Sequence, residues 1–565
     1  MSLHVPSLCV TMAKLLQTLF SRDMDTMPKN ILFIMCDQLR YDYLGCYGNT
    51  RMKTPNIDML AEQGVRFDNA YVPAPLCGPC RMSVYTGRYP RSHGSYWNGS
   101  PLRVGEMTIG DHLNPEGMRT VLCGKTHMVA DTAGMARLGI DPTSAAGKQR
   151  AECGFELWDR LDGVYPAQGG RRPSHYFDYL NAKGYEGANP WHDWANSAEG
   201  ESGEIKSGWL IENNHLPARI AEEDSETPYT TSRAIEFITQ NTQDSWCLHL
   251  SYIKPHWPYI VPEPYASMYG PEDVPPPIRS EDERSKASPI LAAHHAKRSA
   301  QFFAREKLRE KAIPAYMGLI KQIDDQLGRV YDALKETGQW EDTLIVFTSD
   351  HGDYLGDHWL GDKEFFHDVS AKVPLILFDP SQKADGTRGR VCDDLVEAID
   401  LVPSFVEFAG GAPNYDVLEG RSLLPYLYEE DPQPLREYAI SEMDFSETGA
   451  RDFLGLDVDH CRMVMVYDGR FKAVFNNAGL PPVVFDLQND PQELVDIAAD
   501  PAVQGDIERL RAYLNEWSMQ HHAAGTTPRA RRRGTPDDEC KIGVLIGFYD
   551  ENDVETTQGA IHPLS

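Results

Sequence analysis

The sequence predicts an α/β fold built around a large, mostly parallel β-sheet, followed by a small C-terminal α+β part. Three observations support this. Short, continuous apolar runs alternate with helical patterns, which is typical of buried strands in a parallel sheet. Several of these runs are followed directly by polar residues, where the carboxyl end of a strand opens onto a site. From about residue 435 the pattern changes to a hairpin, which predicts a separate antiparallel sheet.

The strand predictions rest on five apolar runs, namely 30–36 (NILFIMC), 120–123 (TVLC), 246–251 (WCLHLS), 343–348 (TLIVFT) and 373–378 (VPLILF). The clearest helix between them covers 316–334, where apolar residues recur every three or four positions. The segment 140–225 is rich in Gly, Asp, Asn and Trp and has weak periodicity. We therefore expect it to be an insertion near the mouth of the site.

The domain boundaries follow from these changes of pattern. A main α/β domain, which carries the predicted site, is expected over 28–434 and a C-terminal α+β subdomain over 435–522. In the subdomain, Asp468-Gly469 separates two apolar segments, which is a strong hairpin signal, and a helix is expected from about 503 to 519. Residues 1–27 are predicted to be a leader without the apolar core and cleavage site of a signal peptide, with Met27 as an alternative start.

Composition narrows the classes of partner. The formal net charge is −30, which argues against nucleic acid or an anionic membrane, because phosphate binding requires clustered Lys and Arg. The one basic run, 529–533, is interpreted as solvated or subunit-contacting. No stretch approaches the roughly 20 apolar residues of a membrane span. The eleven cysteines are scattered and several lie in apolar runs, which predicts buried thiols in a reducing compartment and a cytoplasmic protein.

The most informative local motif surrounds Cys77. Cys77-Gly-Pro-Cys80 has the spacing of a redox dithiol. Alternatively, Cys77-x-Pro-x-Arg81 followed by Thr86-Gly87-Arg88 resembles the sulfatase signature, in which the cysteine is oxidised to formylglycine. A thioredoxin-like domain has about 100 residues and an aromatic residue before the first cysteine, whereas here Leu76 precedes it in a much longer strand pattern. Two buried cysteines in a loop are the third interpretation.

Further polar motifs follow the predicted strands. They are Asp37-Gln38-x-Arg40, Gly124-Lys125-Thr-His127, Pro255-His256-Trp-Pro258, Ser349-Asp350-His351-Gly352, Gly356-Asp357-His358 and Gly361-Asp362-Lys363. A lone Asp after a strand is usually a cap, and a lone His is usually a satisfied core residue. Together and in this order, they resemble the sulfatase family of the alkaline phosphatase superfamily over roughly residues 28 to 520. The resemblance implies an alkaline-phosphatase-like sandwich as the fold of the main domain.

Within this family the chain resembles most the oligomeric arylsulfatase and phosphonate monoester hydrolase group. Asp37-Gln38 and Asp350-His351 stand where other sulfatases commonly have Asp-Asp and Asp-Asn pairs. The resemblance implies a homo-oligomer, either a dimer or a tetramer. The tail 523–565 is its predicted oligomerisation segment, because the apolar residues 542–549 lie within polar sequence. A strand folded back on its own domain is the alternative.

The residues at the strand ends predict a site for one divalent metal ion. Asp37 and Asp350 offer carboxylates, Gln38 a carbonyl oxygen and His351 a nitrogen. This mixed shell is less hard than a typical Ca²⁺ site, so Ca²⁺ and Mn²⁺ both remain. The resemblance implies that Cys77 is converted to formylglycine (3-oxoalanine) by a formylglycine-generating enzyme and also contacts the metal.

The resemblance also implies the catalytic roles. One hydroxyl of the formylglycine hydrate attacks sulfur, and the other then loses its proton to His127, so that sulfate leaves. Arg81 and Lys125 would hold the hydrate. His256 and Lys363 would contact the sulfate and protonate the leaving oxygen, and Asn98 would add a donor near the nucleophile.

One departure from the family pattern lies beside the nucleophile. Cys80 stands where the family usually has Ser or Ala. The core Cys-x-Pro-x-Arg pattern is intact, so we expect modification of Cys77. A disulfide between Cys77 and Cys80 in unmodified protein is the alternative.

The sequence therefore predicts an arylsulfatase-type hydrolase that releases inorganic sulfate and an alcohol or phenol from a small-molecule sulfate monoester. The alternative is a phosphonate monoester or phosphate diester hydrolase of the same family, and a redox or binding protein is a third class. Lys125 and His127 favour sulfate esters, because the phosphonate hydrolase relatives have Tyr and Thr there. Unlike those residues, His127 can act as a base near neutral pH.

Overall fold

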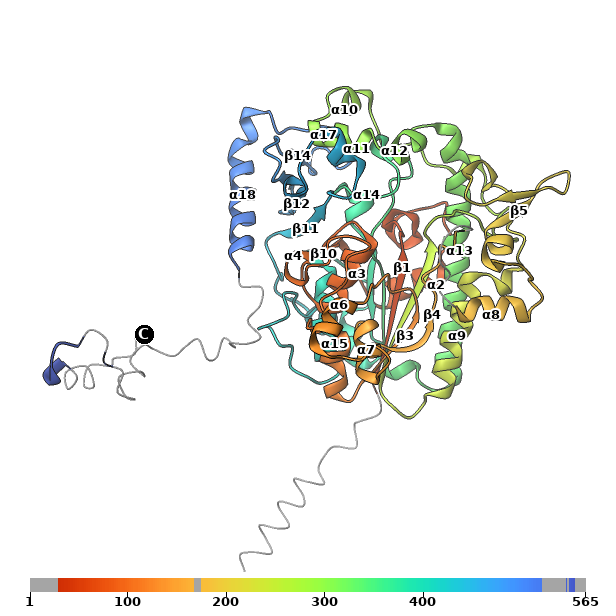
Figure 1. The fold of residues 1–565 in the computed structure, drawn as a ribbon, viewed down its shortest axis with the longest axis horizontal. Coiled ribbons are helices and arrows are strands. Elements are labelled where there is room, and N and C mark those ends of the chain that lie inside the picture. The colour runs from red at the N-terminus through yellow and green to blue at the C-terminus, as the bar shows by residue number, and fades with distance from the viewer. Residues whose placement is uncertain (1–28, 167–173, 521–544, 546–547, 554–565) are drawn as a thin grey trace, which may run out of the picture.

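The structure is a computed structural model that describes residues 29–166, 174–520, 545 and 548–553 (Figure 1). The predicted leader 1–27 lies outside the described residues. So does nearly all of the tail 523–565, including the basic run 529–533 and most of the apolar segment 542–549. The expectations for these segments stay predictions.

An eight-stranded sheet forms the centre of the fold, in the order β10-β2-β9-β8-β1-β7-β3-β4. Its strands are β1 (Asn30–Asp37), β2 (Val65–Tyr71), β3 (Arg119–Gly124), β4 (Glu156–Arg160), β7 (Trp246–Pro255), β8 (Thr343–Ser349), β9 (Leu375–Phe378) and β10 (Arg390–Glu397). Neighbouring strands are parallel except where β9 pairs with β2 and β8. The predicted large, mostly parallel sheet is confirmed.

Helices cover both faces of this sheet, and β1 shows how the sequence produces that arrangement. Its odd-numbered residues from Ile31 to Met35 pack in the core with helices α3 (Cys77–Thr86), α5 (Ile109–Leu113) and α15 (Leu401–Phe408). Its even-numbered residues pack with α2 (Pro55–Gln63), α9 (Glu226–Gln240) and α13 (Glu306–Glu336). Because burying each such side chain contributes about 1.5–3 kcal/mol, a strand covered on both faces has a continuous apolar run.

The predicted helix over 316–334 lies within α13, which extends ten residues further toward the N-terminus and contains Pro314. Figure 1 shows this helix running along the sheet beside α9. It also positions the end of β1, because the Tyr316 hydroxyl donates to the Gln38 carbonyl at 2.7 Å and accepts from the Arg40 N–H at 2.9 Å. A core helix therefore fixes the backbone that carries predicted site residues.

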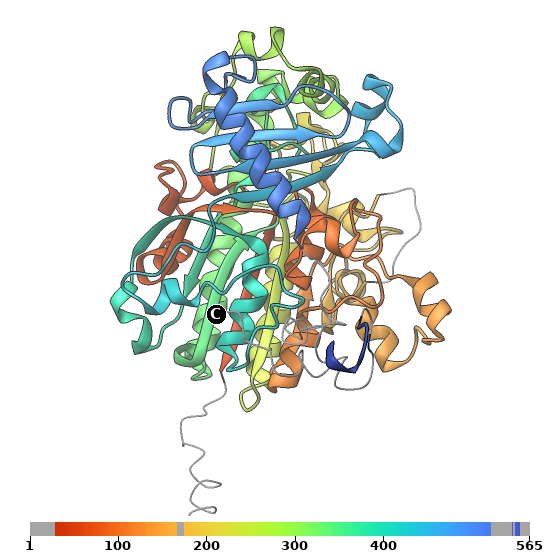
Figure 2. The ribbon, with the colours of Figure 1, turned by 90° about the vertical axis from the view of Figure 1, so that its left-hand side faces the viewer.

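The C-terminal part contains a separate four-stranded antiparallel sheet, in the order β11-β12-β13-β14. Its strands are β11 (Ala439–Asp444), β12 (Arg462–Tyr467), β13 (Phe471–Asn476) and β14 (Val483–Asp486). The predicted hairpin joins β12 and β13 at Asp468-Gly469, where Gly469 has a φ of 92°. Helix α18 (Gln504–Met519) lies across this sheet (Figure 2), as expected for the segment 503–519.

Part of the segment 140–225 belongs to the main sheet, because β4 pairs with β3. The rest contains α7 (Ala145–Ala151), α8 (His175–Ala182) and the short strands β5 (Ser197–Glu199) and β6 (Ile205–Ser207). Residues of α8 and β5 belong to a small, largely aromatic core around Tyr176 and Trp191. The strands β2, β4 and β10 were not predicted. They lie at or next to the edges of the sheet, and charged residues in each of them break up the run of apolar residues.

Among the described residues, no helix is long and apolar enough to cross a membrane. The nine cysteines in this part of the chain are free thiols, and only Cys46 is partly exposed. This agrees with the predicted absence of a disulfide framework for the cysteines that the structure includes.

Candidate active site

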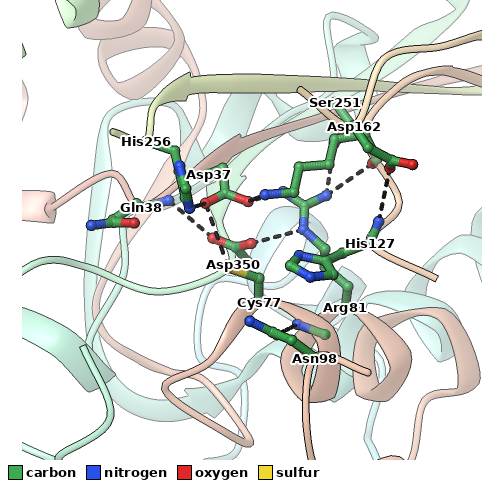
Figure 3. A network of polar contacts seen from close by, with 12 residues as sticks. Asp37, Gln38, Cys77, Arg81, Asn98, His127, Asp162, Ser251, His256 and Asp350 are labelled. Atoms are coloured by element: carbon green, nitrogen blue, oxygen red, sulfur yellow. Dashed lines mark hydrogen bonds and ion pairs between the residues drawn. The ribbon is translucent and has the colours of Figure 1, made fainter. Parts of the chain in front are cut away.

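The polar residues predicted at the strand ends converge at one edge of the main sheet (Figure 3). Asp37 ends β1, Lys125 follows β3, His256 follows β7 and Asp350 follows β8. These four strands are parallel neighbours, so their carboxyl ends meet. Cys77 is the first residue of α3, and its Sγ atom lies 3.7 Å from Asp37 Oδ1.

Arg81 holds the two acidic residues of the site together. Its Nε donates to Asp350 Oδ2 at 2.7 Å, and its Nη2 lies 3.2 Å from Asp37 Oδ2. Nη1 donates to the Ser251 hydroxyl at 2.7 Å and to the Lys125 carbonyl at 3.0 Å. Arg81, Asp37 and Asp350 are fully buried, so this pairing offsets the cost of removing three charges from water.

Four of the five predicted metal ligands form one compact group. Ligand atoms of Asp37, Cys77, Asp350 and His351 all lie within 4.8 Å of one another. The Nδ1 atom of His351 donates to the Gly352 carbonyl at 2.8 Å, so Nε2 is the ring nitrogen that faces the group, 3.1 Å from Cys77 Sγ. Two carboxylates and an imidazole nitrogen at this spacing fit a divalent cation.

Gln38, the fifth predicted ligand, stands beside this group. Its Oε1 atom accepts a hydrogen bond from Lys363 Nζ at 3.0 Å, and the same ammonium lies 3.2 Å from Cys77 Sγ. The Gln38 backbone N–H donates to Asp350 Oδ1 at 3.0 Å. The Gln38 amide oxygen is thus linked to Cys77 through the Lys363 ammonium, and its backbone is linked to Asp350.

The Cys77 thiol lies in a strongly cationic environment. Burial alone would raise the pKa of this thiol, but Lys363, Lys125 and His351 lower the pKa well below its usual value. Asn98 does not contact the thiol directly. Its Oδ1 accepts the backbone N–H of Gly78 at 2.8 Å and thereby fixes the first turn of α3. The site is built to stabilise negative charge at residue 77.

The two lysines differ in their contacts. Lys125 forms a buried ion pair with Asp37. Burial would lower the pKa of Lys363, but Cys77 and Asp362 raise that pKa above its usual range, so its ammonium stays protonated. The Lys363 ammonium thus donates a hydrogen bond at residue 77.

His256 and His127 are placed differently around the thiol. His256 Nδ1 donates to the Trp257 carbonyl at 2.6 Å, and burial lowers the pKa of its ring to about 4. Near neutral pH its Nε2 therefore carries a lone pair, 3.9 Å from Asp37 Oδ1. His127 has a φ of 57°, and its buried Nδ1 has no hydrogen-bond partner among the described residues.

Asp162 explains how His127 is held, and no sequence motif indicated it. Its Oδ1 accepts the backbone N–H groups of Thr126 and His127 at 3.1 and 3.2 Å. Arg160 donates to Oδ2 of the same carboxylate at 2.7 Å. Asp162 comes from the segment 140–225, whose weak periodicity concealed a residue that supports the site.

A cavity of about 630 Å³ opens beside these residues. Its polar side includes Lys125, His127, His256 and Lys363. Much of the remaining wall is apolar or aromatic, and includes Leu76, Met128, Val129, Leu157, Tyr165 and Trp257. The site can therefore place an anionic group against the cations while the rest of a small ester contacts apolar surface.

A second buried group of metal-type ligands, Glu283, His358 and His367, has a geometry unlike the first. The His358 and His367 rings stack with centroids 3.8 Å apart and planes inclined by 8°. Lone pairs lying in two parallel ring planes do not converge on one ion, and His358 Nδ1 already contacts Glu283 at 2.6 Å. This cluster is an ion-paired part of the core.

Comparison with known proteins agrees with this geometry. The sulfatase family model matches residues 29–150 and 156–412, and a model described as the C-terminal part of N-sulphoglucosamine sulphohydrolase matches 356–520. Among solved structures, the phosphonate monoester hydrolase of Silicibacter pomeroyi superimposes with a TM-score of 0.76 at 30% identity, covering 88% of this chain and 97% of that one.

Similarity to curated proteins extends over most of the chain. The multifunctional alkaline phosphatase superfamily protein PehA of Trinickia caryophylli is 33% identical over 522 residues, which is 87% of this chain and 96% of the relative. An arylsulfatase of Clostridium perfringens is 30% identical over 502 residues, or 86% and 94% of the two chains. The protein is an enzyme of the sulfatase family, within the alkaline phosphatase superfamily.

Proposed function

We propose that this enzyme hydrolyses sulfate monoesters of the aryl type, with Cys77 converted to formylglycine and one divalent metal ion, Ca²⁺ or Mn²⁺, held by Asp37, Gln38, Asp350, His351 and residue 77. The observation that carries the proposal is the compact group of ligand atoms around Cys77, next to the ammonium of Lys363. A cationic, buried nucleophile position suits the transfer of an anionic group.

The metal ion and the formylglycine would supply different parts of the chemistry. A divalent ion bound there would polarise a sulfuryl oxygen and favour the ionised nucleophile. The formylglycine hydrate would supply the attacking hydroxyl and a second hydroxyl, whose loss of a proton releases sulfate.

The residues of the chain supply binding, orientation and proton transfer. Lys125 and Lys363 offset the negative charge of the sulfate, and Lys363 holds a proton for the leaving oxygen. His127 accepts the proton of the second hydroxyl, since its Nδ1 has no competing partner among the described residues. His256 is unprotonated at Nε2 in the free site and would gain a proton only when an anion binds nearby.

A second candidate is hydrolysis of phosphonate monoesters or phosphate diesters. The similarity to a phosphonate monoester hydrolase structure favours it. A sulfate monoester and a phosphonate monoester each carry one negative charge, so charge alone does not separate them. The Lys125 and His127 pair favours sulfate, because His127 can remove a proton near neutral pH.

The substrate prediction concerns relative rates. The kcat/KM for 4-nitrophenyl sulfate is expected to exceed that for 4-nitrophenyl phenylphosphonate, two esters with one leaving group. Replacing Lys125→Tyr and His127→Thr together should lower the ratio of the two constants at least tenfold, because the base and a fixed charge are lost. If the enzyme without these substitutions has the larger kcat/KM for the phenylphosphonate, it belongs to the second candidate class.

The modification prediction concerns residue 77. Mass spectrometry of enzyme made in cells that contain a formylglycine-generating enzyme should show loss of sulfur and gain of a carbonyl at this position. Cys77→Ala should abolish turnover and leave the unfolding temperature nearly unchanged. Cys80→Ser is the matched control and should keep both conversion and activity. Active protein that carries only a thiol at residue 77 would rule out this chemistry.

The remaining proposals concern the cellular context. The expected partners are a small sulfate ester, the formylglycine-generating enzyme and further copies of the chain in a dimer or tetramer. We propose no nucleic acid or membrane partner and a cytoplasmic location, since the cysteines of the described part are free.

A further inference from the structure

The side-chain amide of Gln38 is held in one orientation by charged groups on its two sides. On one side, its Nε2 donates to Asp353 Oδ2 at 2.6 Å and lies 3.4 Å from Asp362 Oδ1. On the other side, its Oε1 accepts from Lys363 Nζ at 3.0 Å. An ionised carboxylate only accepts and an ammonium only donates, so the network fixes which end of the amide faces which side.

Asp353 is itself rigidly placed. It is fully buried, just after β8, and shares a short chain segment with Asp350 and His351. The Tyr259 hydroxyl donates to its Oδ2, the atom that also accepts from Gln38, and the Leu355 N–H donates to its Oδ1 at 3.0 Å. The carboxylate therefore cannot turn away from the Gln38 amide without losing several hydrogen bonds at once.

This arrangement explains why residue 38 is an amide. A carboxylate at this position would face Asp353 and Asp362, and the like charges would oppose one another's ionisation. A glutamine offers a donor to the two acids and an acceptor to the cationic side. That acceptor is connected to the metal-ligand group through Lys363, because the ammonium that it binds also lies 3.2 Å from Cys77 Sγ.

We propose that Asp353 is a positioning residue for the metal ion, which fixes the Gln38 amide so that Oε1 faces the group formed by Asp37, Cys77, Asp350 and His351. The inference rests on the proposed function in one respect, the assignment of Gln38 as a metal ligand. Asp353 does not contact the metal group itself. It acts through the hydrogen bond that occupies the Gln38 nitrogen.

A double-mutant cycle on Mn²⁺ binding separates positioning from simple charge. Metal-depleted full-length protein is titrated with Mn²⁺ in four forms, which are the unaltered chain, Asp353→Asn, Gln38→Ala and the double variant. The state of residue 77 is matched by mass spectrometry. Outer partners of metal ligands typically contribute 10–100-fold in affinity. Asp353→Asn should therefore weaken Mn²⁺ binding at least tenfold alone and less than threefold in the Gln38→Ala background.

The possible results of this titration distinguish a failure of the inference about Asp353 from a failure of the proposed role of Gln38. If Asp353→Asn costs the same factor in both backgrounds, or costs nothing in the first, the carboxylate does not act through Gln38 and the inference is overturned. If Gln38→Ala leaves Mn²⁺ affinity unchanged, the assignment of Gln38 as a ligand in the proposed function fails instead. Should Asp353→Asn not fold, Tyr259→Phe replaces it. That variant removes one hydrogen bond to Asp353 and should weaken binding a few-fold, again only when Gln38 is present.

Discussion

At the scale of single residues, buried charges are accommodated in two ways. The guanidinium of Arg81 contacts the carboxylates of Asp37 and Asp350, so each buried charge there has an opposite partner. Glu442 in β11 is also buried, but accepts a hydrogen bond from the neutral backbone N–H of Arg91 at 3.1 Å. Burial raises the pKa of its carboxyl group to about 7. Its ionised form therefore destabilises the folded protein.

The first prediction concerns how the Glu442 carboxyl group makes the stability of the protein depend on pH. Its pKa is about 7 in the folded protein against an ordinary 4.5. The folded state thus binds the proton more tightly than the unfolded state. The contribution of protonated Glu442 to the free energy of unfolding is therefore fully present below pH 4.5 and is lost as the pH rises through 7. Glutamine resembles the protonated acid. Glu442→Gln should therefore stabilise the protein more at pH 8.5 than at pH 5.5, by on the order of 2 kcal/mol.

Urea unfolding at the two pH values measures this difference. The matched control is Glu437→Gln, an exposed position two residues before β11, which should show no such dependence on pH. An equal stability change for Glu442→Gln at both pH values would contradict the proposed burial effect.

Residue types at the site could be predicted from the sequence, whereas their contact partners could not. Asp37, Cys77, Asp350 and His351 were expected to form one group, and the structure places them together. Arg81 was expected beside the nucleophile, but its contacts are with acids 44 and 269 positions away in the chain. Such pairings depend on the crossing of distant strands, which local patterns do not contain.

At the scale of elements, α18 attaches the small sheet to the segment that follows α3, the helix that begins with Cys77. Trp517 of α18 packs against the Tyr89 ring at 5.3 Å, and the Arg91 guanidinium lies 4.5 Å above the Trp517 ring. Arg91 also donates to the Ser518 carbonyl at 2.9 Å. Because α3 ends at Thr86, these contacts act within a few residues of the helix that begins with Cys77.

Trp517→Ala should therefore loosen α18 from the small sheet. Trp517 is 4% exposed, and removing a buried aromatic side chain of this size costs about 3–5 kcal/mol. Urea unfolding should report the loss, and amide hydrogen exchange should rise in α18 before it rises in β1. Met519→Ala is the matched control on the same helix, since Met519 is 83% exposed and should change neither measurement. Unaltered exchange in α18 of the Trp517 variant would show that other contacts hold the helix.

The elements differ in how well the sequence predicted them, for a physical reason. Strands covered on both faces, such as β1 and β8, have uninterrupted apolar runs and were predicted nearly to their ends. The edge strand β4 (ELWDR) has charged residues at three of its five positions and carries little apolar signal. The reversed direction of β9 between β2 and β8 is set by its partners, and its own residues do not encode it.

At the scale of the whole molecule, the site depends on the C-terminal part of the chain. Lys472 of β13 is buried and contacts both Asp368 and the Phe366 carbonyl, close in sequence to Lys363. The same ammonium pairs with Glu493 at 2.6 Å. A buried charged side chain from the small sheet thus holds the segment that delivers a lysine to the site. A shared hydrophobic cluster also joins the two sheets, because Tyr71 of β2 and Leu395 of β10 pack with apolar residues of the small sheet.

The last prediction concerns assembly through the tail. Residues 542–549 (IGVLIGFY) are apolar within a polar tail, and such a segment is poorly accommodated alone in water. We propose that it packs on a neighbouring copy of the chain in a symmetric oligomer. A chain that ends at Thr526 should therefore have a smaller mass by light scattering than the full chain. A chain that ends at Asp553 is the matched control, because it keeps the apolar residues and loses only the residues after them, and its mass should correspond to the full oligomer. If the chain ending at Thr526 keeps the oligomeric mass, the tail is not the assembly segment.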